Sequence, residues 1–352
     1  MKKIQIIVLS VIAIAAIGSC AKAVSEGVNE ADQRYFNAWI SLNAPHTERI
    51  GRGTYVYPES IVEGTGAVVE KDGFAIVRYT CRSLEGDITG YTNKETAEQL
   101  GNYSPSSFYG ADILTTTDGT IRAGIADAMI GMKAGGKKTF IVPSWLTSYA
   151  YYETEAEYLN QTSDINTTIY ELEVLDFTKN INDWELTKME ECFRKPSFFN
   201  GRFSTTEIQD STSLGFYFKM LTKYPSEKEF PQDTTFYINY TGRLLDIPEY
   251  SNGLVFDTTV ENVAKDNYIY SSSKTYSPLQ VKWGETHSDI TLDGSNVVAG
   301  FSQTLWQMAN CGPGTKAVGV FYSPLGYSYD GSGSIPAYAP LVFEIEIVEK
   351  EE

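Results

Sequence analysis

The side chains of this sequence that could do chemistry are mainly aromatic hydroxyls and carboxylates. Its 352 residues include 24 tyrosines and 17 phenylalanines but only two histidines, His46 and His287. A Ser-His-Asp triad or a histidine-rich zinc site is therefore poorly supported, and we expect neither a metal nor another cofactor. The pair Phe256-Asp257 is more informative, because a carboxylate beside an apolar pocket is costly unless it has a partner.

The first twenty residues are expected to be a targeting signal rather than part of the fold. Two lysines precede an apolar run over residues 4–17, which is too short for a comfortable membrane span and is typical of a signal peptide. The run ends in Ile17-Gly18-Ser19-Cys20, which resembles a bacterial lipobox. A lipidated Cys20 predicts anchoring to the outer membrane, facing the periplasm or the cell surface. Ordinary signal cleavage with an incidental Cys20 is the alternative.

Three further cysteines, Cys81, Cys192 and Cys311, are far apart and form no CxxC motif. Three cysteines cannot all pair internally. We expect buried or partly buried thiols, and a single disulfide remains an alternative.

Charge argues against one class of partner. The formal net charge is -17 and the pI is about 4.6. Phosphate binding needs clustered lysine and arginine, so we expect no nucleic-acid partner.

The elements that must position these residues occur twice, in the same order. Residues 74–80 and 235–242 both have a strand pattern, and residues 169–174 and 341–347 alternate as closing strands. Between them lie two helical windows, each entered through a glycine and apolar at i, i+4 and i+7. These windows contain Gly124, Ile125, Met129 and Met132 in the first copy and Gly300, Phe301, Leu305 and Met308 in the second.

The spacing of the two copies indicates a two-fold internal repeat with an insertion. The offset is 161 residues between Tyr79 and Tyr240 and 176 between Ile125 and Phe301. This difference predicts about fifteen extra residues in the second copy, which we place between Asp257 and Gly300.

The sequence divides into five parts. A helix is predicted over residues 30–42, with Tyr35, Trp39 and Leu42 on one face; docking on the first domain and a role as a spacer both remain open. We expect a signal peptide (1–19), a tether with this helix (20–50), a first domain (51–178), a linker (179–210) and a second domain (211–352).

The repeated order of elements resembles the FKBP family of peptidyl-prolyl cis-trans isomerases. In the second copy the resemblance rests on residues 238–245, 255–257, 296–301, 322–329, 335–336 and 341–343. It implies an α+β fold of two FKBP-like domains, each an antiparallel twisted sheet wrapped around one short helix.

The first copy fits this family less well. Residues 63–66 and 132–137 match, and Tyr79, Ile121 and Tyr170 fall at pocket positions. However, Tyr91-Thr92 replaces the Phe-Asp pair, Ile125 replaces the aromatic floor, and the Ile-Pro pair is absent. We therefore expect the first domain to be catalytically weak or inert.

The resemblance also implies the site. Asp257 would orient pocket groups, and Tyr327 or Tyr329 would donate a hydrogen bond to the substrate carbonyl. Phe301 stands where the family usually has tryptophan. The proline pocket would be formed by Tyr240, Phe256, Val297, Val298, Phe301, Ile335 and Phe343.

The function implied is prolyl isomerisation that assists the folding of exported proteins, with proline-containing polypeptides as partners. One alternative is a non-catalytic domain of the same fold that binds a peptide or protein. A second alternative is a surface lipoprotein that binds glycans. Only the numbers of tyrosines and tryptophans support it.

Overall fold

The computed structural model describes residues 28–147, 154–159, 166–195, 209–210, 214–227, 229–248 and 253–349. The predicted signal peptide and Cys20 lie outside these residues. Within the described residues no helix is long and apolar enough to cross a membrane.

The first half of the chain forms one sheet with a helix packed against it. Its elements are α2 (Val28–Asn43), β1 (Glu48–Ile50), β2 (Thr54–Val56), η1 (Pro58–Ser60), β3 (Phe74–Arg82), β4 (Ile88–Tyr91), α3 (Lys94–Gln99), β5 (Asp112–Thr115), α4 (Ala123–Met129), β6 (Lys137–Val142), η2 (Ser144–Leu146), α5 (Glu155–Leu159) and β7 (Thr168–Thr178). The strand order is β1-β2-β6-β7-β3-β4, and β5 also pairs with β3.

The second half repeats this plan after α6 (Ile181–Phe193). Its elements are β8 (Gln209–Asp210), β9 (Phe216–Thr222), β10 (Thr235–Leu244), β11 (Val255–Thr258), α7 (Glu261–Asp266), β12 (Leu279–Lys282), η4 (His287–Asp289), β13 (Thr291–Leu292), β14 (Ser295–Asn296), α8 (Ala299–Gln307), β15 (Lys316–Phe321), η5 (Ser323–Leu325) and β16 (Leu341–Val348). The order is β14-β13-β12-β10-β16-β15-β9-β8, with β11 also on β10.

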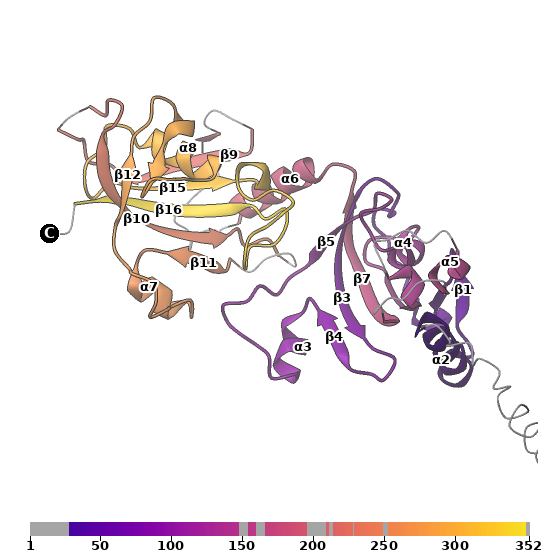
Figure 1. The fold of residues 1–352 in the computed structure, drawn as a ribbon. Helices are drawn as coiled ribbons and strands as arrows, with labels where there is room; N and C mark the ends of the chain where they lie inside the picture. Colours follow the sequence, from indigo (N-terminus) through magenta and orange to yellow (C-terminus); the bar gives the residue numbers. More distant parts are fainter. Residues whose placement is uncertain are drawn as a thin grey trace, which may run out of the picture.

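The predicted fold class is confirmed: the chain is α+β, with two antiparallel sheets and a short helix packed on each (Figure 1). The central strands pair in the same way in both halves, β3 with β7 and β10 with β16. On β16 the predicted alternation is present, since Leu341, Phe343, Ile345 and Ile347 are all buried.

Both helical windows turn their apolar residues into a core, as predicted. Ile125, Met129 and Met132 are buried in the first domain, and Phe301, Leu305 and Met308 in the second. The glycine that opens each helix allows close packing. A Cβ at position 300 would lie 2.2 Å from the Phe321 ring, and one at Gly124 would lie 2.4 Å from Val142.

The N-terminal helix docks on the first domain. Asn29 Nδ2 donates to the Tyr158 carbonyl at 2.7 Å, and Trp39 Nε1 donates to the Leu84 carbonyl at 3.0 Å. The predicted face was wrong in part, because Tyr35 and Leu42 are 52% and 80% exposed. The buried hydrophobic residue of this helix is Phe36, which packs edge-to-face on Tyr55.

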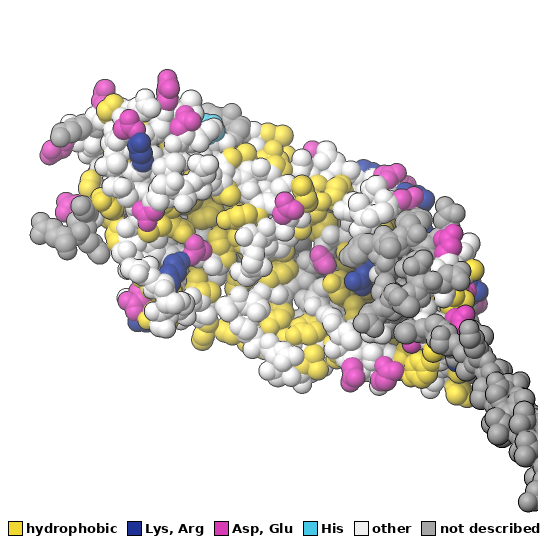
Figure 2. All heavy atoms as spheres, viewed as in Figure 1, with side chains coloured by type: hydrophobic (Ala, Val, Ile, Leu, Met, Phe, Trp, Pro, Cys, Tyr) yellow, Lys and Arg dark blue, Asp and Glu magenta, His cyan; other side chains and the backbone are white. Residues whose placement is uncertain are grey.

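Helix α6 lies where the two sheets meet (Figure 1). Its apolar residues Trp184, Met189 and Phe193 share one core with Ile76 and Ile113 of the first sheet and with Val318, Val320 and Val342 of the second. Phe108 of the first domain also packs against the second-domain core. In the face drawn in Figure 2, hydrophobic side chains gather toward the middle, with a few acidic ones among them, and further acidic side chains lie around the edge.

One carboxylate is buried in this junction. Glu185 accepts hydrogen bonds from the Ser323 backbone nitrogen at 2.7 Å and from Ser323 Oγ at 2.6 Å. Burial raises the pKa of Glu185 to about 7, although the two bonds from Ser323 act in the opposite direction. The contact ties α6 to η5 of the second domain.

The insertion in the second copy is divided, which corrects its predicted position. Strand registers pair Thr80 with Tyr91 in the first domain and Thr241 with Thr258 in the second. The offset between equivalent residues of the two domains is therefore 161 at Thr80 and Thr241 but already 167 at Tyr91 and Thr258, on β4 and β11. Six extra residues therefore precede Asp257, in the loop between β10 and β11. The remaining nine lie between β12 and α8, around η4, β13 and β14.

Each domain carries the same tyrosine loop after its small helix. Tyr103 stacks on Tyr109 at 5.6 Å between ring centroids, and Tyr270 stacks on Tyr276 at 5.5 Å. In each loop the second tyrosine's hydroxyl accepts from a serine backbone nitrogen at 3.0 Å. These loops, at a constant offset of 167 residues, were not found in the sequence because they lack hydrophobic periodicity.

The three cysteines other than Cys20 are buried free thiols. Cys192 Sγ lies 3.1 Å from the Asp246 carbonyl. This agrees with the expectation of core thiols and not with the alternative of one disulfide.

Candidate functional site

The second domain contains a cavity of about 450 Å³ beside the first turn of α8. Nine of the ten predicted pocket residues line it. Tyr329 does not, and it is 66% exposed. The lining residues that the sequence predicted are Tyr240, Phe256, Asp257, Val297, Val298, Phe301, Tyr327, Ile335 and Phe343.

Aromatic rings from four elements form the apolar wall. Phe343 of β16 packs edge-to-face on Phe301 of α8 at 5.0 Å and on Phe256 of β11 at 5.6 Å. Tyr240 of β10 packs edge-to-face on Phe301 at 5.5 Å. Gly242 makes room for this cluster, since a Cβ there would lie 2.6 Å from Phe256 and 2.8 Å from Phe343. Edge-to-face pairs of this kind hold rings in fixed orientations.

Asp257 forms the polar edge of the cavity and is fully engaged. It accepts a hydrogen bond from the Tyr240 hydroxyl, forms an ion pair with Lys274, and accepts from the Thr258 backbone nitrogen at 2.9 Å. Burial, followed by the bond to Asp257, raises the pKa of Tyr240, so this hydroxyl stays protonated as a donor.

Lys274 is a functional candidate that the sequence did not reveal. It comes from the tyrosine loop, and its ammonium lies 5.6 Å from the Tyr276 ring centroid. Nothing in the serine- and tyrosine-rich segment around it distinguishes this lysine from a solvated one. The ion pair depends on the loop folding back over β11.

Tyr327 supplies the other hydroxyl of the cavity. It follows η5 and is partly buried. Burial, and to a lesser degree Asp257, raise the pKa of Tyr327. Among the described residues its hydroxyl has no hydrogen-bond partner, and the side chain lines the cavity.

The cavity lining also includes residues for which the sequence had not predicted a role in the pocket. Leu292 and Asn296 of the nine-residue insertion line the cavity, as do residues 332–334. A pair of backbone hydrogen bonds between Ser332 and Ile335, each 2.9 Å long, closes this turn, and the buried Ile335 lines the cavity. The insertion therefore extends the pocket wall.

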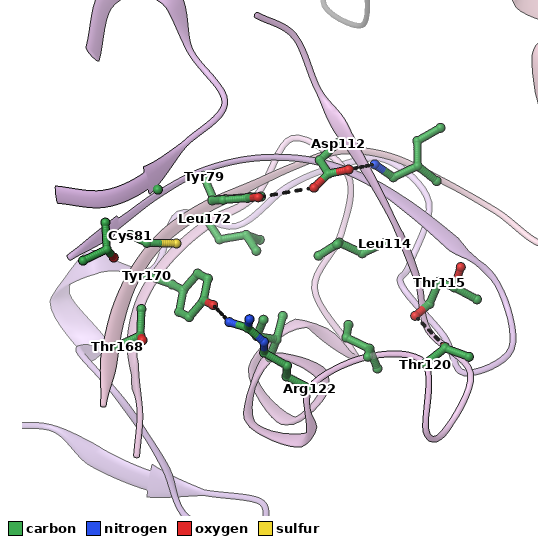
Figure 3. Close-up of a pocket in the computed structure, with 15 residues that line it drawn as sticks. Tyr79, Cys81, Asp112, Leu114, Thr115, Thr120, Arg122, Thr168, Tyr170 and Leu172 are labelled. Atoms are coloured by element: carbon green, nitrogen blue, oxygen red, sulfur yellow. Dashed lines mark hydrogen bonds between the residues drawn. The ribbon is translucent and has the colours of Figure 1, made fainter. Parts of the chain in front are cut away.

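The first domain has a cavity of about 510 Å³ at the corresponding place, lined in part by Tyr79, Ile121, Ile125 and Tyr170 (Figure 3). Strand registers correct one predicted replacement. Gly90 pairs with Cys81 as Asp257 pairs with Gly242, so Thr89-Gly90 stands where the second domain has Phe256-Asp257. The Tyr79 hydroxyl instead donates to Asp112 at 3.3 Å.

Comparisons with known proteins give structural neighbours only. No family model matches the chain, and no curated protein matches its sequence.

Among solved structures, the three FKBP domains of wheat FKBP73 align over 86% of this chain and 98% of that one, at 16% identity and a TM-score of 0.27. FkpA from Escherichia coli aligns over 48% of this chain and 58% of that one, at 22% identity and a TM-score of 0.30. A peptidyl-prolyl cis-trans isomerase from Pseudomonas syringae aligns over 49% and 94%, at 21% identity and a TM-score of 0.29.

Proposed function

We propose that the second domain catalyses cis-trans isomerisation of X-Pro bonds in exported polypeptides. Rotation about a peptide bond has a barrier of about 18–20 kcal/mol, and X-Pro is the bond for which cis and trans are close in energy. Twisting the amide breaks its resonance and makes it less polar. A dry aromatic pocket therefore binds the twisted state better than the planar, solvated one.

The observation that carries this proposal is the combination of an aromatic wall with a donor hydroxyl at one cavity. Phe301 and Phe343 offer an apolar surface for a proline ring. The Tyr327 hydroxyl would hold the carbonyl of the rotating bond. Asp257 fixes the Tyr240 hydroxyl, so the polar edge is ordered before substrate binds.

The test is the rate of isomerisation of a short Leu-Pro or Phe-Pro peptide in the presence of the chain from Ala21 onward. Acceleration above the uncatalysed rate supports the proposal. If the peptide binds, as seen by shifts of its NMR signals, but isomerises at the uncatalysed rate, the alternative of a peptide-binding domain without turnover holds. Phe301 in place of tryptophan is the feature that favours this alternative.

We also propose that Cys20 is lipidated and anchors the chain to the outer membrane, where it faces the periplasm or the cell surface. The support is the apolar run followed by Ile17-Gly18-Ser19-Cys20. Acyl chains contribute about 0.8 kcal/mol of membrane binding for each buried methylene. If the chain faces the periplasm, such an anchor would keep the pocket among polypeptides that have just crossed the inner membrane.

A further inference from the structure

Part of the wall of the second-domain cavity comes from one long loop. Residues 322–340 connect β15 with β16, and we call them the pocket loop. Tyr327 and residues 332–335 of this loop line the cavity. In Figure 1 the loop lies at the end of the second domain that faces the first, beside α6. Contacts outside the second domain can therefore fix its position.

The beginning of the pocket loop is bonded to α6. Ser323 donates to the Glu185 carboxylate twice, from its backbone nitrogen at 2.7 Å and from Oγ at 2.6 Å. Glu185 is fully buried, and so is Ser323. A buried carboxylate is costly without hydrogen bonds, and a buried N–H group is costly for the same reason. Each partner therefore satisfies the other, and separating them would leave buried polar groups unpaired.

Two backbone hydrogen bonds connect this anchor to the segment around Tyr327. The Ser323 carbonyl accepts from the Ser328 nitrogen at 2.9 Å, and the Ser328 carbonyl accepts from the Tyr338 nitrogen at 2.8 Å. Ser328 and Tyr338 both have a left-handed backbone, with φ of 50° and 56°. This conformation is uncommon for residues other than glycine and persists where surrounding contacts impose it. Because Tyr327 directly precedes Ser328, the same contacts fix the tyrosine of the pocket.

The end of the pocket loop is held by the first domain. The Tyr338 ring packs edge-to-face on Phe74, with 5.5 Å between the ring centroids. Phe74 begins β3, where it pairs with Thr115 of β5 and with Thr178 of β7. Both rings also pack against the apolar core around α6. The two anchors of the pocket loop thus come from parts of the chain that precede the second domain.

The first domain has a similar anchor. Helix α2 precedes this domain as α6 precedes the second, and its buried Asn29 donates to the Tyr158 carbonyl at 2.7 Å. Tyr158 lies between β6 and β7, as Ser323 lies between β15 and β16. In both halves a polar side chain of the preceding helix is therefore bonded to the segment between the last two strands. This repetition indicates that the anchor is a regular component of the fold.

We propose that the first domain and α6 hold the pocket loop in place, and that Glu185 and Phe74 are positioning residues for isomerisation. Neither residue lines the cavity. Glu185 would act through Ser323. Phe74 would act through Tyr338, and both would keep the Tyr327 hydroxyl at one point of the cavity, because a fixed donor needs no reorganisation during the reaction. This inference rests on the proposed function and gives the first domain a role that needs no turnover of its own.

The test uses the chain from Ala21 onward as wild type, as Glu185→Leu and as Glu185→Gln. One readout is hydrogen exchange of the Ser328 and Tyr338 amides, with the amides of the β10–β16 ladder as an internal reference. The other is kcat and KM for a Leu-Pro peptide. In Glu185→Leu we expect exchange of the two loop amides to rise at least tenfold relative to the reference. We also expect kcat to fall about tenfold with KM nearly unchanged, because the aromatic wall remains. Glu185→Gln keeps an acceptor and should restore most of both.

Phe74→Leu tests the other anchor. It removes the ring on which Tyr338 packs, and it should raise exchange of the Tyr338 amide and lower kcat several-fold. Its matched control is Phe177→Leu, because Phe177 lies on the neighbouring strand β7 but packs against the core of the first domain. Glu190→Leu, on the exposed side of α6, is the control for Glu185→Leu. Both controls should leave loop exchange and kcat at the wild-type values.

A milder variant covers the case in which Glu185→Leu does not fold. Ser323→Ala removes only the Oγ bond and should change both readouts in the same direction by a smaller factor. Three results from folded variants would overturn the proposal: unchanged loop exchange in Glu185→Leu and Phe74→Leu, an equal rise in the loop and in the β10–β16 ladder, or faster loop exchange with an unchanged kcat.

Hydrogen exchange needs no turnover, which separates this inference from the proposed function. If the wild-type chain does not isomerise the peptide, the proposed function fails, and the role of these residues in turnover fails with it. Loop exchange in the variants then shows independently whether the first domain holds the pocket loop.

Discussion

Asp257 holds the polar edge of the second-domain pocket together. It is bonded to the Tyr240 hydroxyl on one side and to Lys274 on the other. Because the Tyr240 ring also packs on Phe301, the carboxylate fixes an aromatic wall as well as a hydroxyl. In the first domain the equivalent position is Gly90, and Asp112 bonds Tyr79 from a different strand.

We therefore expect Asp257→Ala to lower kcat/KM for a Leu-Pro peptide about tenfold, corresponding to about 1.4 kcal/mol of transition-state stabilisation. The variant leaves the Tyr240 hydroxyl without its acceptor in a partly buried site. Asp257→Asn keeps an acceptor and should give an intermediate value. Isomerisation kinetics and thermal melting measure the two effects separately.

The control for this experiment is Glu261→Ala, which removes an exposed ion pair with Lys265 on the neighbouring helix α7. It should leave isomerisation unchanged, because surface pairs contribute little. Full activity in Asp257→Ala, with the chain folded, would mean that this carboxylate plays no part in turnover.

At the scale of elements, α6 connects the two domains and also packs between their sheets. It buries Trp184, Met189 and Phe193 against both sheets and places Glu185 against η5. Because folding raises the pKa of Glu185 from 4.5 to about 7, the folded chain binds a proton more tightly than the unfolded chain. The resulting stabilisation is fully present below pH 4.5 and is lost as the pH rises through about 7.

We predict that the free energy of unfolding falls between pH 5 and pH 8 by a larger amount in the wild-type chain than in Glu185→Gln. The two losses should differ by at most about 3 kcal/mol. Glutamine keeps an acceptor and a neutral side chain at every pH. Urea denaturation at the two pH values measures the difference. Glu190→Gln, on the exposed side of α6, should behave as wild type, and equal pH dependence in all three chains would contradict the prediction.

The elements differ in how far the sequence could predict them. Strong periodicity located the strands and both buried helices, and the pocket residues Phe301 and Phe343 belong to these regular elements. Lys274, Leu292 and Asn296 come from loops and short bridges, where no pattern says which side chain turns inward. For the same reason the sequence did not separate Tyr327 from Tyr329, since both lie in one turn.

At the scale of the whole molecule, the two domains share one arrangement of strands and helix, but their cavities are lined by different kinds of residues. The second-domain cavity is walled by rings, whereas the first-domain cavity contains Arg122 in a protein of net charge -17. The shared core around α6 joins the two domains.

Anchoring also belongs to this scale. We expect Cys20→Ser to remove the chain from the membrane fraction, because the serine hydroxyl cannot replace the thiol that receives lipid. Fractionation of cells that express each form measures this, and Cys311→Ser is the control for loss of a thiol. A Cys20→Ser chain that stays in the membrane fraction would rule out anchoring through this residue.

The most direct test of the central claim compares matched substitutions in the two pockets. Exchange NMR of a Phe-Pro peptide would measure isomerisation with the chain from Ala21 onward as wild type, as Phe343→Leu and as Tyr170→Leu, each checked for folding by its melting temperature. We predict acceleration by wild type, retained in Tyr170→Leu and reduced at least tenfold in Phe343→Leu. Acceleration that survives Phe343→Leu but is lost in Tyr170→Leu, or no acceleration by the folded wild type, would contradict the assignment of turnover to the second domain.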